Sequence, residues 1–268
     1  MLQKDVRYEK HVLSNGVQVF FALSPHATNL AFDLTVMAGS AHERPSEYGA
    51  GHALEHAFFL GSQNYSRAQT EDVQNLWLGD KGASTNKQTI SFYCNNGEGT
   101  YEGTASAFAK VAGGRTLPDH HAQEITHFLW DIVDKPLFEP AAIEREIDVV
   151  ANEVGWRRDE HGFFYDHIIP GIFEAPYNRS IGAEKSEAAA LTREALLSYY
   201  HRHFIADNMK LFIACPELDV AQLLNTLEGT FGQMKNGLAT PRLTARFMSA
   251  DYREFAPHRL QNGVYVAF

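Results

Sequence analysis

The sequence predicts an α+β fold, in which strand-like and helix-like segments alternate along the chain. Strands are indicated where apolar and polar residues alternate, as in NLAFDLTVMAGS (residues 29–40) and TISFYC (89–94). Helices are indicated where apolar residues recur every three or four positions, as in AQEITHFLWDIVDKPLF (122–138). With 268 residues, of which 44% are hydrophobic, the chain can bury one sizeable core.

The N-terminal half predicts a strand, a strand, two helices and a further strand. In VLSNGVQVFFAL (12–23) an Asn-Gly turn precedes a strand, and the strand over 29–40 follows. We expect one helix across GAGHALEHAFFLGS (49–62) and a second over 66–82, which Gly79 and Gly82 end. After the strand at 89–94, the glycine-rich residues 95–121 predict a loop or an insertion.

The C-terminal half predicts further helices around one strand. Two amphipathic helices cover 122–138 and 141–160, and LTREALLSYYHRHF (191–204) is a helix with Thr192 as its N-cap. A strand over 209–216 and a helix over 220–234 complete this part. The sequence therefore divides into a domain over residues 1–234, a linker over 235–258 and a final segment, 259–268, that repeats the Asn-Gly-then-strand pattern of residues 13–21.

Charge and composition exclude some classes of partner. The formal net charge of −10 argues against a nucleic-acid surface, so we expect no nucleic-acid partner. The sequence shows no signal peptide and no uninterrupted apolar span of about 18 residues, so we expect no membrane contact. Two cysteines far apart do not make a disulfide framework. These features predict a cytoplasmic location.

The helix over 49–62 carries an H-x-x-E-H string, formed by His52, Glu55 and His56. Residues i and i+4 project from the same helix face, so the two histidines can bind one metal ion between them. Glu55 leans to the side of that pair, where its carboxylate can reach a water bound to the metal. The alternative is that two core histidines and a glutamate occur together by chance, because the chain has 13 histidines.

A catalytic zinc site with two histidines usually needs a third protein ligand. Glu146 and Glu153 lie on one stripe of the helix over 141–160, with apolar residues between them. Carboxylates on an otherwise apolar stripe need a partner, which makes this helix the place to look. The alternative is an ordinary amphipathic helix whose glutamates face water.

These residues carry a family resemblance. H-x-x-E-H is the inverzincin motif, and the chain resembles the pitrilysin, insulin-degrading enzyme and mitochondrial processing peptidase family. The similarity runs in order over roughly residues 6–232, through the segments LSNGVQVFF, MAGSAHERPSEYGAGHALEHAFFLGS, GASTNKQTISFY, PLFEPAAIEREIDVVANE and LTREALLSYYHRHFIADNMKLFIA. The resemblance implies a mixed, largely antiparallel sheet flanked by helices, as in a processing-peptidase-like metallohydrolase domain.

The resemblance also implies roles for individual residues. The zinc ligands of the family correspond to His52, His56 and Glu153, so Zn²⁺ is the expected cofactor. Residues 1–234 are then the expected zinc-binding catalytic domain. Glu55 corresponds to the general base and Glu146 to a second catalytic acidic residue that supports the site. The interval from His56 to Glu153 is longer than is usual in the family, which fits an insertion at 95–121. If the insertion lies elsewhere, Glu146 is the rival ligand.

The expected activity is that of a zinc-dependent endopeptidase acting on extended oligopeptides or small unfolded polypeptides. Glu55 would take a proton from the attacking water and pass it to the leaving amine. The peptide substrate would add a strand to the sheet against residues 89–94, beside Asn86. The alternatives are a non-catalytic or partner-dependent subunit of the same fold and a metal-free structural protein.

The family resemblance further implies a chamber made by facing halves. The chain resembles one complete repeat followed by the start of a second, truncated repeat at 259–268. We therefore expect that a second domain or a partner chain is needed to complete the active chamber, and that the 268-residue chain alone binds zinc but cleaves peptides weakly.

Overall fold

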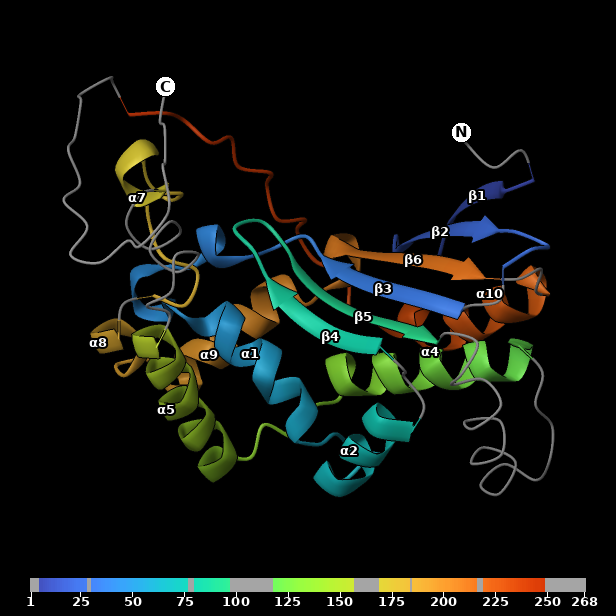
Figure 1. Ribbon diagram of the computed structural model, residues 1–268, viewed down its shortest axis with the longest axis horizontal. Coiled ribbons are helices and arrows are strands. Elements are labelled where there is room, and N and C mark those ends of the chain that lie inside the picture. Colours follow the sequence, from blue (N-terminus) through green and yellow to red (C-terminus); the bar gives the residue numbers. More distant parts are fainter. Residues whose placement is uncertain are drawn as a thin grey trace, which may run out of the picture.

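The computed structural model describes residues 5–27, 30–76, 80–96, 118–156, 169–183, 185–215 and 219–248. These residues form one six-stranded sheet with helices packed against it (Figure 1). The strands are β1 (Arg7–Val12), β2 (Gln18–Leu23), β3 (Leu30–Val36), β4 (Asp80–Thr85), β5 (Ile90–Asn96) and β6 (Met209–Cys215). The predicted α+β class is confirmed.

The strand order is β1-β2-β6-β3-β5-β4, so β6 from late in the chain is inserted between β2 and β3. The β2–β6 pair is parallel and every other pair is antiparallel. This mixed, largely antiparallel sheet is the one that the family resemblance implied. Side chains along β2 and β3 alternate between buried and partly buried positions, because one face of the sheet packs on helices.

The longer helices gather on one side of the sheet (Figure 1). The longer ones are α1 (Ala50–Ala57), α2 (Arg67–Leu76), α4 (Pro118–Asp134), α5 (Pro140–Trp156), α9 (Arg193–His203) and α10 (Val220–Gly229); α7 (Ile169–Ile172) and α8 (Lys185–Ala188) are short. α4 lies against β3 and α10, whereas α1 lies against β4, α5 and α9. α1 is thus held between the sheet and two helices. Among the described helices, none combines the length and the apolar character that crossing a membrane requires.

The predicted N-cap of α9 is present, since the Thr192 side chain accepts a hydrogen bond from the backbone N–H of Ala195 at 3.2 Å. The single helix expected over 66–82 is wrong. α2 ends at Leu76 and β4 begins at Asp80, so Gly82 lies in a strand. The cause is tertiary: Gly82 faces Tyr93 across the β4–β5 pair, and a Cβ at Gly82 would lie 2.5 Å from the Tyr93 hydroxyl.

The expectation that the strand at 89–94 forms the edge that receives a peptide is also wrong. β5 is paired on both sides, with β3 and with β4. Among the described strands, the edge next to β5 is β4. Local sequence patterns identify strands, but they do not reveal which strand ends a sheet. Most of the expected insertion, residues 97–117, lies outside the described residues.

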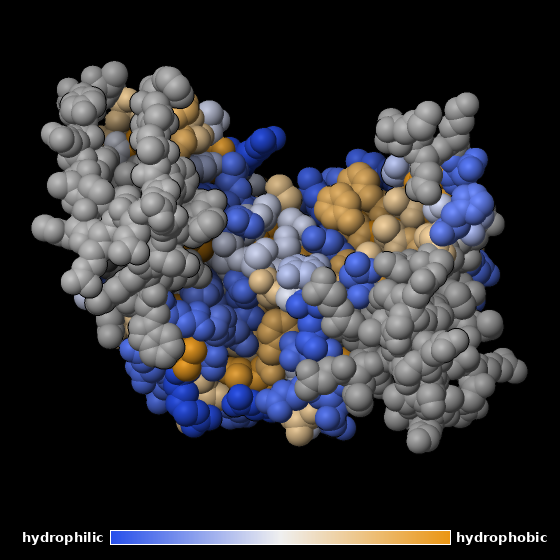
Figure 2. All heavy atoms as spheres, viewed as in Figure 1, coloured by the Kyte–Doolittle hydropathy of each residue, from blue (hydrophilic) through white to orange (hydrophobic). Residues whose placement is uncertain are grey.

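The face of the sheet away from the helices has an apolar patch over β2 and β6 (Figure 2). Phe20 and Phe212 stack there with ring centroids 5.0 Å apart. From residue 235 the chain continues without helix or strand to residue 248, where an isolated bridge joins Phe173 and Phe247. Residues 249–268, including the expected second repeat, lie outside the described residues, so the predicted division into domain, linker and repeat stays a prediction.

Candidate metal centre

α1 begins at a turn that only glycine adopts easily, since Gly49 has φ +89°. The carboxylate of Glu43 accepts two hydrogen bonds at this end of the helix, from the backbone N–H groups of Gly49 and Gly51, each at 2.9 Å. These bonds satisfy donors that the first turn of a helix leaves without an intrahelical partner. Burial raises the pKa of Glu43 to about 8, although the same two hydrogen bonds oppose that rise.

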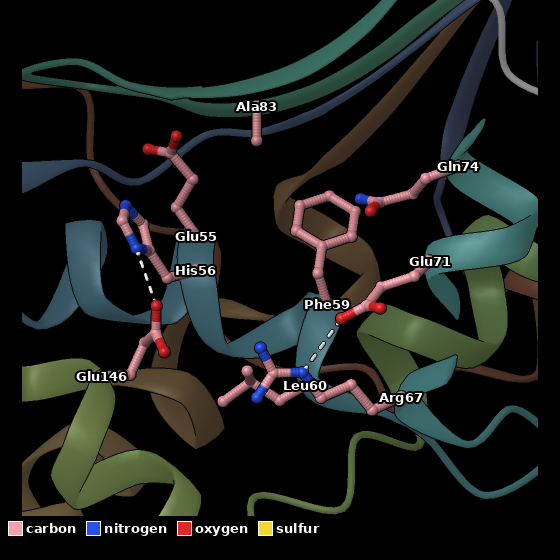
Figure 3. A pocket seen from close by; sticks show the side chains of 9 residues that line it. All are labelled: Glu55, His56, Phe59, Leu60, Arg67, Glu71, Gln74, Ala83 and Glu146. Atoms are coloured by element: carbon pink, nitrogen blue, oxygen red, sulfur yellow. Dashed lines mark hydrogen bonds and ion pairs between the residues drawn. The ribbon is translucent and has the colours of Figure 1, made fainter. Parts of the chain in front are cut away.

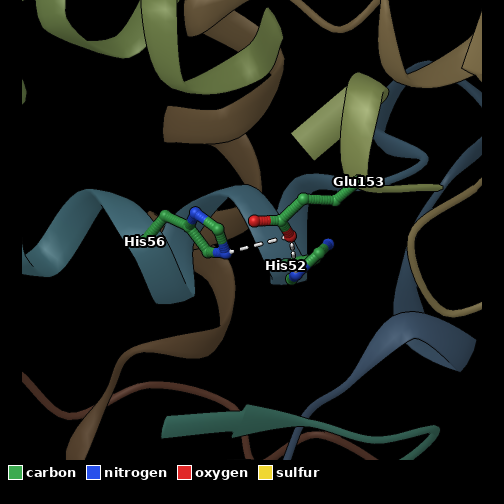
Figure 4. Close-up of side chains that lie close together, drawn as sticks. All are labelled: His52, His56 and Glu153. Atoms are coloured by element: carbon green, nitrogen blue, oxygen red, sulfur yellow. Dashed lines mark ion pairs between the residues drawn. The ribbon is translucent and has the colours of Figure 1, made fainter. Parts of the chain in front are cut away.

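α1 and α5 bring three predicted residues together (Figure 4). His52 and His56 lie one turn apart on α1, and Glu153 reaches them from α5. The Nε2 atoms of His52 and His56 lie 3.5 and 3.6 Å from the same atom, Oε2 of Glu153. One ligand atom from each of the three residues lies within 4.8 Å of the others. His52 is buried, whereas the Glu153 side chain is 41% exposed, so the cluster opens to solvent on the α5 side.

This donor set fits zinc. Two imidazole nitrogens and one carboxylate oxygen are the ligands of many catalytic zinc sites. Ligand atoms about 2.0–2.1 Å from a tetrahedral zinc lie roughly 3.3 Å from one another, and the observed separations of 3.5 and 3.6 Å are close to that value. Two of the three separations between ligand atoms are therefore already close to those of a zinc site, and all three atoms lie within 4.8 Å of one another.

Glu146 takes a different position. Its Oε1 lies 3.0 Å from His56 Nδ1, on the opposite side of the imidazole ring from Nε2 (Figure 3). A carboxylate that binds the outer nitrogen of a metal-binding histidine fixes the tautomer and the orientation of the ring. The geometry therefore favours Glu153 over Glu146 as the residue that faces both Nε2 atoms.

Glu55 lies on α1 between the two histidines. Its Oε2 accepts a hydrogen bond of 2.6 Å from the hydroxyl of Thr85, the last residue of β4. Sequence reasoning did not single out Thr85, because nothing local in GASTNK connects it to a residue thirty positions earlier. Glu43 was missed for the same reason; its acidic side chain lies well before the helix that it caps.

Asn86 lies at the tip of the β4–β5 hairpin and is exposed. Its backbone N–H donates to the Thr89 carbonyl at 2.8 Å, and its own carbonyl accepts from Ser40 N–H at 3.0 Å. These bonds fix the tip near the segment that leads into α1. The structure does not bring Asn86 into the cluster of His52, His56 and Glu153.

A pocket of about 300 Å³ adjoins the cluster (Figure 3). It lies between α1, β4, α2 and α5 and is lined by Glu55, His56, Phe59, Leu60, Arg67, Glu71, Gln74, Ala83 and Glu146. Its apolar wall comes from the 3-10 turn Phe58–Leu60, which follows α1, and from β4. α2 supplies a polar rim in which Arg67 and Glu71 form an ion pair of 3.1 Å. The pocket is large enough for a side chain of a bound molecule.

The model of one protein family matches residues 19–181, a range that includes the whole cluster. That family is Insulinase (Peptidase family M16).

Curated relatives carry related names. An uncharacterized zinc protease of Rickettsia felis is 22% identical over 89% of this chain and 53% of its own length. The mitochondrial-processing peptidase subunit beta of Lentinula edodes is 27% identical over 88% of this chain and 47% of its own. The mitochondrial cytochrome b-c1 complex subunit 1 of Mus musculus is 26% identical over 94% and 49%. The chain thus spans about half the length of these relatives.

Solved structures share the fold. Pitrilysin matches with a TM-score of 0.72 and 20% identity, over 92% of this chain and 25% of that chain. A protease from Helicobacter pylori matches with the same TM-score and 16% identity, over 90% of this chain and 55% of that chain. The chain therefore shares the fold of these structures over about nine tenths of its length.

Proposed function

Because the chain belongs to the insulinase family of peptidases, M16, we propose that it is a zinc-dependent endopeptidase. The observation that carries the proposal is the convergence of His52 and His56 Nε2 on one oxygen of Glu153. Zinc held by these three residues supplies Lewis acidity toward the carbonyl of the scissile peptide bond.

Glu55 is the proposed general base. Its carboxylate accepts a proton from the water that attacks the scissile carbonyl and delivers that proton to the leaving amine. Glu146 acts through His56, whose Nδ1 it binds at 3.0 Å, so that Nε2 stays directed at the metal position. These roles account for each ionisable group that α1 and α5 bring to the site.

The proposed substrate is an extended oligopeptide or a small unfolded polypeptide. Among the described strands β4 pairs with β5 alone, so a peptide can add as a further strand along β4. Main-chain hydrogen bonds would then supply affinity with little dependence on sequence. Asn86 follows directly after β4, where its exposed side chain can contact the same peptide.

The pocket beside Glu55 suggests where selectivity arises. A peptide on β4 passes Ala83, which lines the pocket together with Phe59 and Leu60. A substrate side chain next to the scissile bond would contact these apolar groups and would meet the Arg67–Glu71 pair only at its far end. Bulky apolar side chains at that position are therefore the expected preference.

We further propose that a second domain or a partner chain completes the active chamber. Two of the relatives are named as subunits, and the chain spans about half of their length. A facing wall would orient the peptide against β4, and orientation contributes strongly to rate. The chain alone should therefore bind zinc yet cleave peptides weakly.

One experiment tests the proposal. Zinc content is measured by mass spectrometry, and hydrolysis of a quenched fluorescent peptide is followed with and without a chelator, for the chain alone and with a partner chain of the same fold. The expected result is one zinc per chain, chelator-sensitive cleavage and a higher rate with the partner. Zinc binding without cleavage under either condition would indicate the alternative, a non-catalytic subunit, which the match to a cytochrome b-c1 subunit favours.

A further inference from the structure

We propose that Thr85 is a positioning residue for Glu55, so that the strand expected to bind the peptide also holds the general base. The inference rests on the proposed function, because it assigns Thr85 a part in the same reaction. It concerns a contact between β4 and α1 rather than the metal ligands themselves.

The contact is short and involves a charged acceptor. The Thr85 hydroxyl donates to Glu55 Oε2 at 2.6 Å, and both residues are half-buried. Hydroxyl-to-carboxylate hydrogen bonds of this length are charge-assisted and roughly twice as strong as neutral ones. Such a bond fixes the rotation of the carboxylate about its last torsion, which is otherwise broad.

Gly51 makes the close approach of β4 to α1 feasible. A Cβ at Gly51 would lie 3.2 Å from Glu43 Oε1, which is closer than ordinary packing allows. It would lie 3.4 Å from Thr85 Cγ2, which is at the limit of ordinary packing. Gly51 precedes Glu55 by four residues, so both lie on the face of α1 that meets the strand. The Thr85 hydroxyl also lies 3.4 Å from the Gly51 carbonyl.

The direction of the Thr85 side chain follows from its place in the strand. Side chains alternate along β4, so Thr85 and Ala83 point to the same face, and Ala83 lines the pocket that contains Glu55. Ser84 points the other way. Because a β-branched side chain is stiff at χ1, Thr85 holds its hydroxyl in place better than a freely rotating serine would.

These observations give Thr85 a specific effect on rate. A peptide that pairs with the backbone of β4 occupies the edge of the strand, whereas the Thr85 side chain reaches from its face to the base. β4 and the Glu55 carboxylate therefore keep the same relative position while the peptide is bound. Loss of the hydroxyl should lower kcat by about 10–100-fold, the range typical of groups that orient catalytic residues, and should leave KM nearly unchanged.

The test compares four variants of the zinc-loaded protein, assayed with its partner chain if activity requires one. Thr85→Val and Thr85→Ala remove the hydroxyl, and Thr85→Ser keeps it. Thr35→Val is the matched control, because the Thr35 hydroxyl also donates to a carboxylate on a strand, Asp33 Oδ1 at 2.7 Å, away from the cluster. Zinc content, kcat and KM are measured, and crystal structures of Thr85→Val and wild type locate the Glu55 carboxylate.

We expect Thr85→Val and Thr85→Ala to have a lower kcat than wild type, with zinc content and KM unchanged. Thr85→Ser should retain most of the wild-type rate. The control, Thr35→Val, should match wild type in all three measurements. In the Thr85→Val crystals the Glu55 carboxylate should leave its position while His52 and His56 keep theirs. A Thr85→Val protein with normal kcat, or with Glu55 unmoved, overturns the inference. If wild type cleaves no peptide, the proposed function fails, and the position of Glu55 in the crystals still decides the role of Thr85.

Discussion

Within the described part of the chain, two pairs of histidine rings lie in contact, and their surroundings differ. The rings of His52 and His56 are 4.8 Å apart, centroid to centroid, and those of His42 and His203 are 5.9 Å apart. The Nε2 atoms of the first pair both face one carboxylate oxygen, that of Glu153. The ring nitrogens of the second pair instead form hydrogen bonds with backbone groups, the Thr240 hydroxyl and the Arg202 guanidinium.

Both nitrogens of each ring in the second pair are used within the protein. His42 Nδ1 accepts from Gly39 N–H at 3.1 Å, so Nε2 carries the proton and donates to the Pro241 carbonyl at 3.1 Å. His203 Nε2 accepts from Arg202 Nε at 3.0 Å, so Nδ1 donates to the Thr240 hydroxyl at 2.7 Å. These bonds fasten residues 240 and 241 to the body of the protein.

The comparison shows that proximity of histidines does not make a metal site. What distinguishes the first pair is that two ring nitrogens converge on a carboxylate at distances suited to one ion. In the second pair the acidic neighbour, Glu47, is bound by Arg202, and the rings hold an extended segment. The first pair is therefore the proposed catalytic site, and the second pair stabilises the fold.

The largest expected effect concerns the base beside the first pair. Glu55→Gln keeps the size of the side chain but removes the proton acceptor, so turnover of a quenched peptide should fall by about 10²-fold or more. Zinc content by mass spectrometry should stay the same. Glu144→Gln, at an exposed position on α5, is the control and should behave as wild type. Near-normal turnover of Glu55→Gln would refute the general-base role.

The second prediction separates the surroundings of the two histidine pairs by replacing the glutamate beside each pair, Glu153 or Glu47, with glutamine. Glu153→Gln should reduce zinc affinity by more than about 100-fold, since loss of even an outer partner costs 10–100-fold, and should leave thermal stability of the metal-free protein nearly unchanged.

Glu47→Gln should lower the stability of the protein and leave its zinc affinity unchanged. Glu47 is 1% exposed and accepts from Arg202 Nη1 at 2.8 Å and from Ser198 at 3.1 Å. Breaking a buried ion pair from one side costs about 3–5 kcal/mol in unfolding free energy, with zinc affinity unaffected. Denaturant unfolding and metal titration of both variants check the two patterns, and equal effects on both properties would remove the distinction between the regions.

The third prediction tests the position of Glu146. Because it binds the outer nitrogen of His56, Glu146→Gln should weaken zinc binding by about 10–100-fold, less than Glu153→Gln does. Competition with a chromophoric chelator measures both affinities. A larger loss for Glu146→Gln would make Glu146 the ligand.

The last prediction is a pH dependence of stability that arises in the second pair. Burial, with a contribution from nearby Arg202, lowers the pKa of His203 to about 3, and burial lowers the pKa of His42 as well. In the unfolded chain a histidine binds its proton near pH 6.5. Between about pH 6.5 and 3 the unfolded state therefore binds more protons, and stability falls as the pH falls.

Unfolding free energies measured across this range should rise with pH, and His203→Gln should reduce the slope. A slope unchanged by His203→Gln would show that the dependence comes from other groups.

Sequence reasoning predicted much of the fold correctly. The alternation in residues 29–40 corresponds to β3, and the apolar spacing around 122–138 and 191–204 corresponds to α4 and α9. It was wrong where a long-range contact overrode a local pattern. The apolar spacing at 66–82 favoured one long helix, but pairing with β5 draws residues 80–85 into a strand.

For the candidate site, the sequence determined which residues can act and the tertiary structure determined which of them meet. The i, i+4 spacing alone puts His52 and His56 on one face of a helix, because helix geometry is local. The choice between Glu146 and Glu153 depends on how α5 packs against α1, and the contact of Thr85 with Glu55 depends on β4 lying against α1. Neither is fixed by neighbours in sequence, because each contact joins segments that lie 30 or more residues apart in the chain.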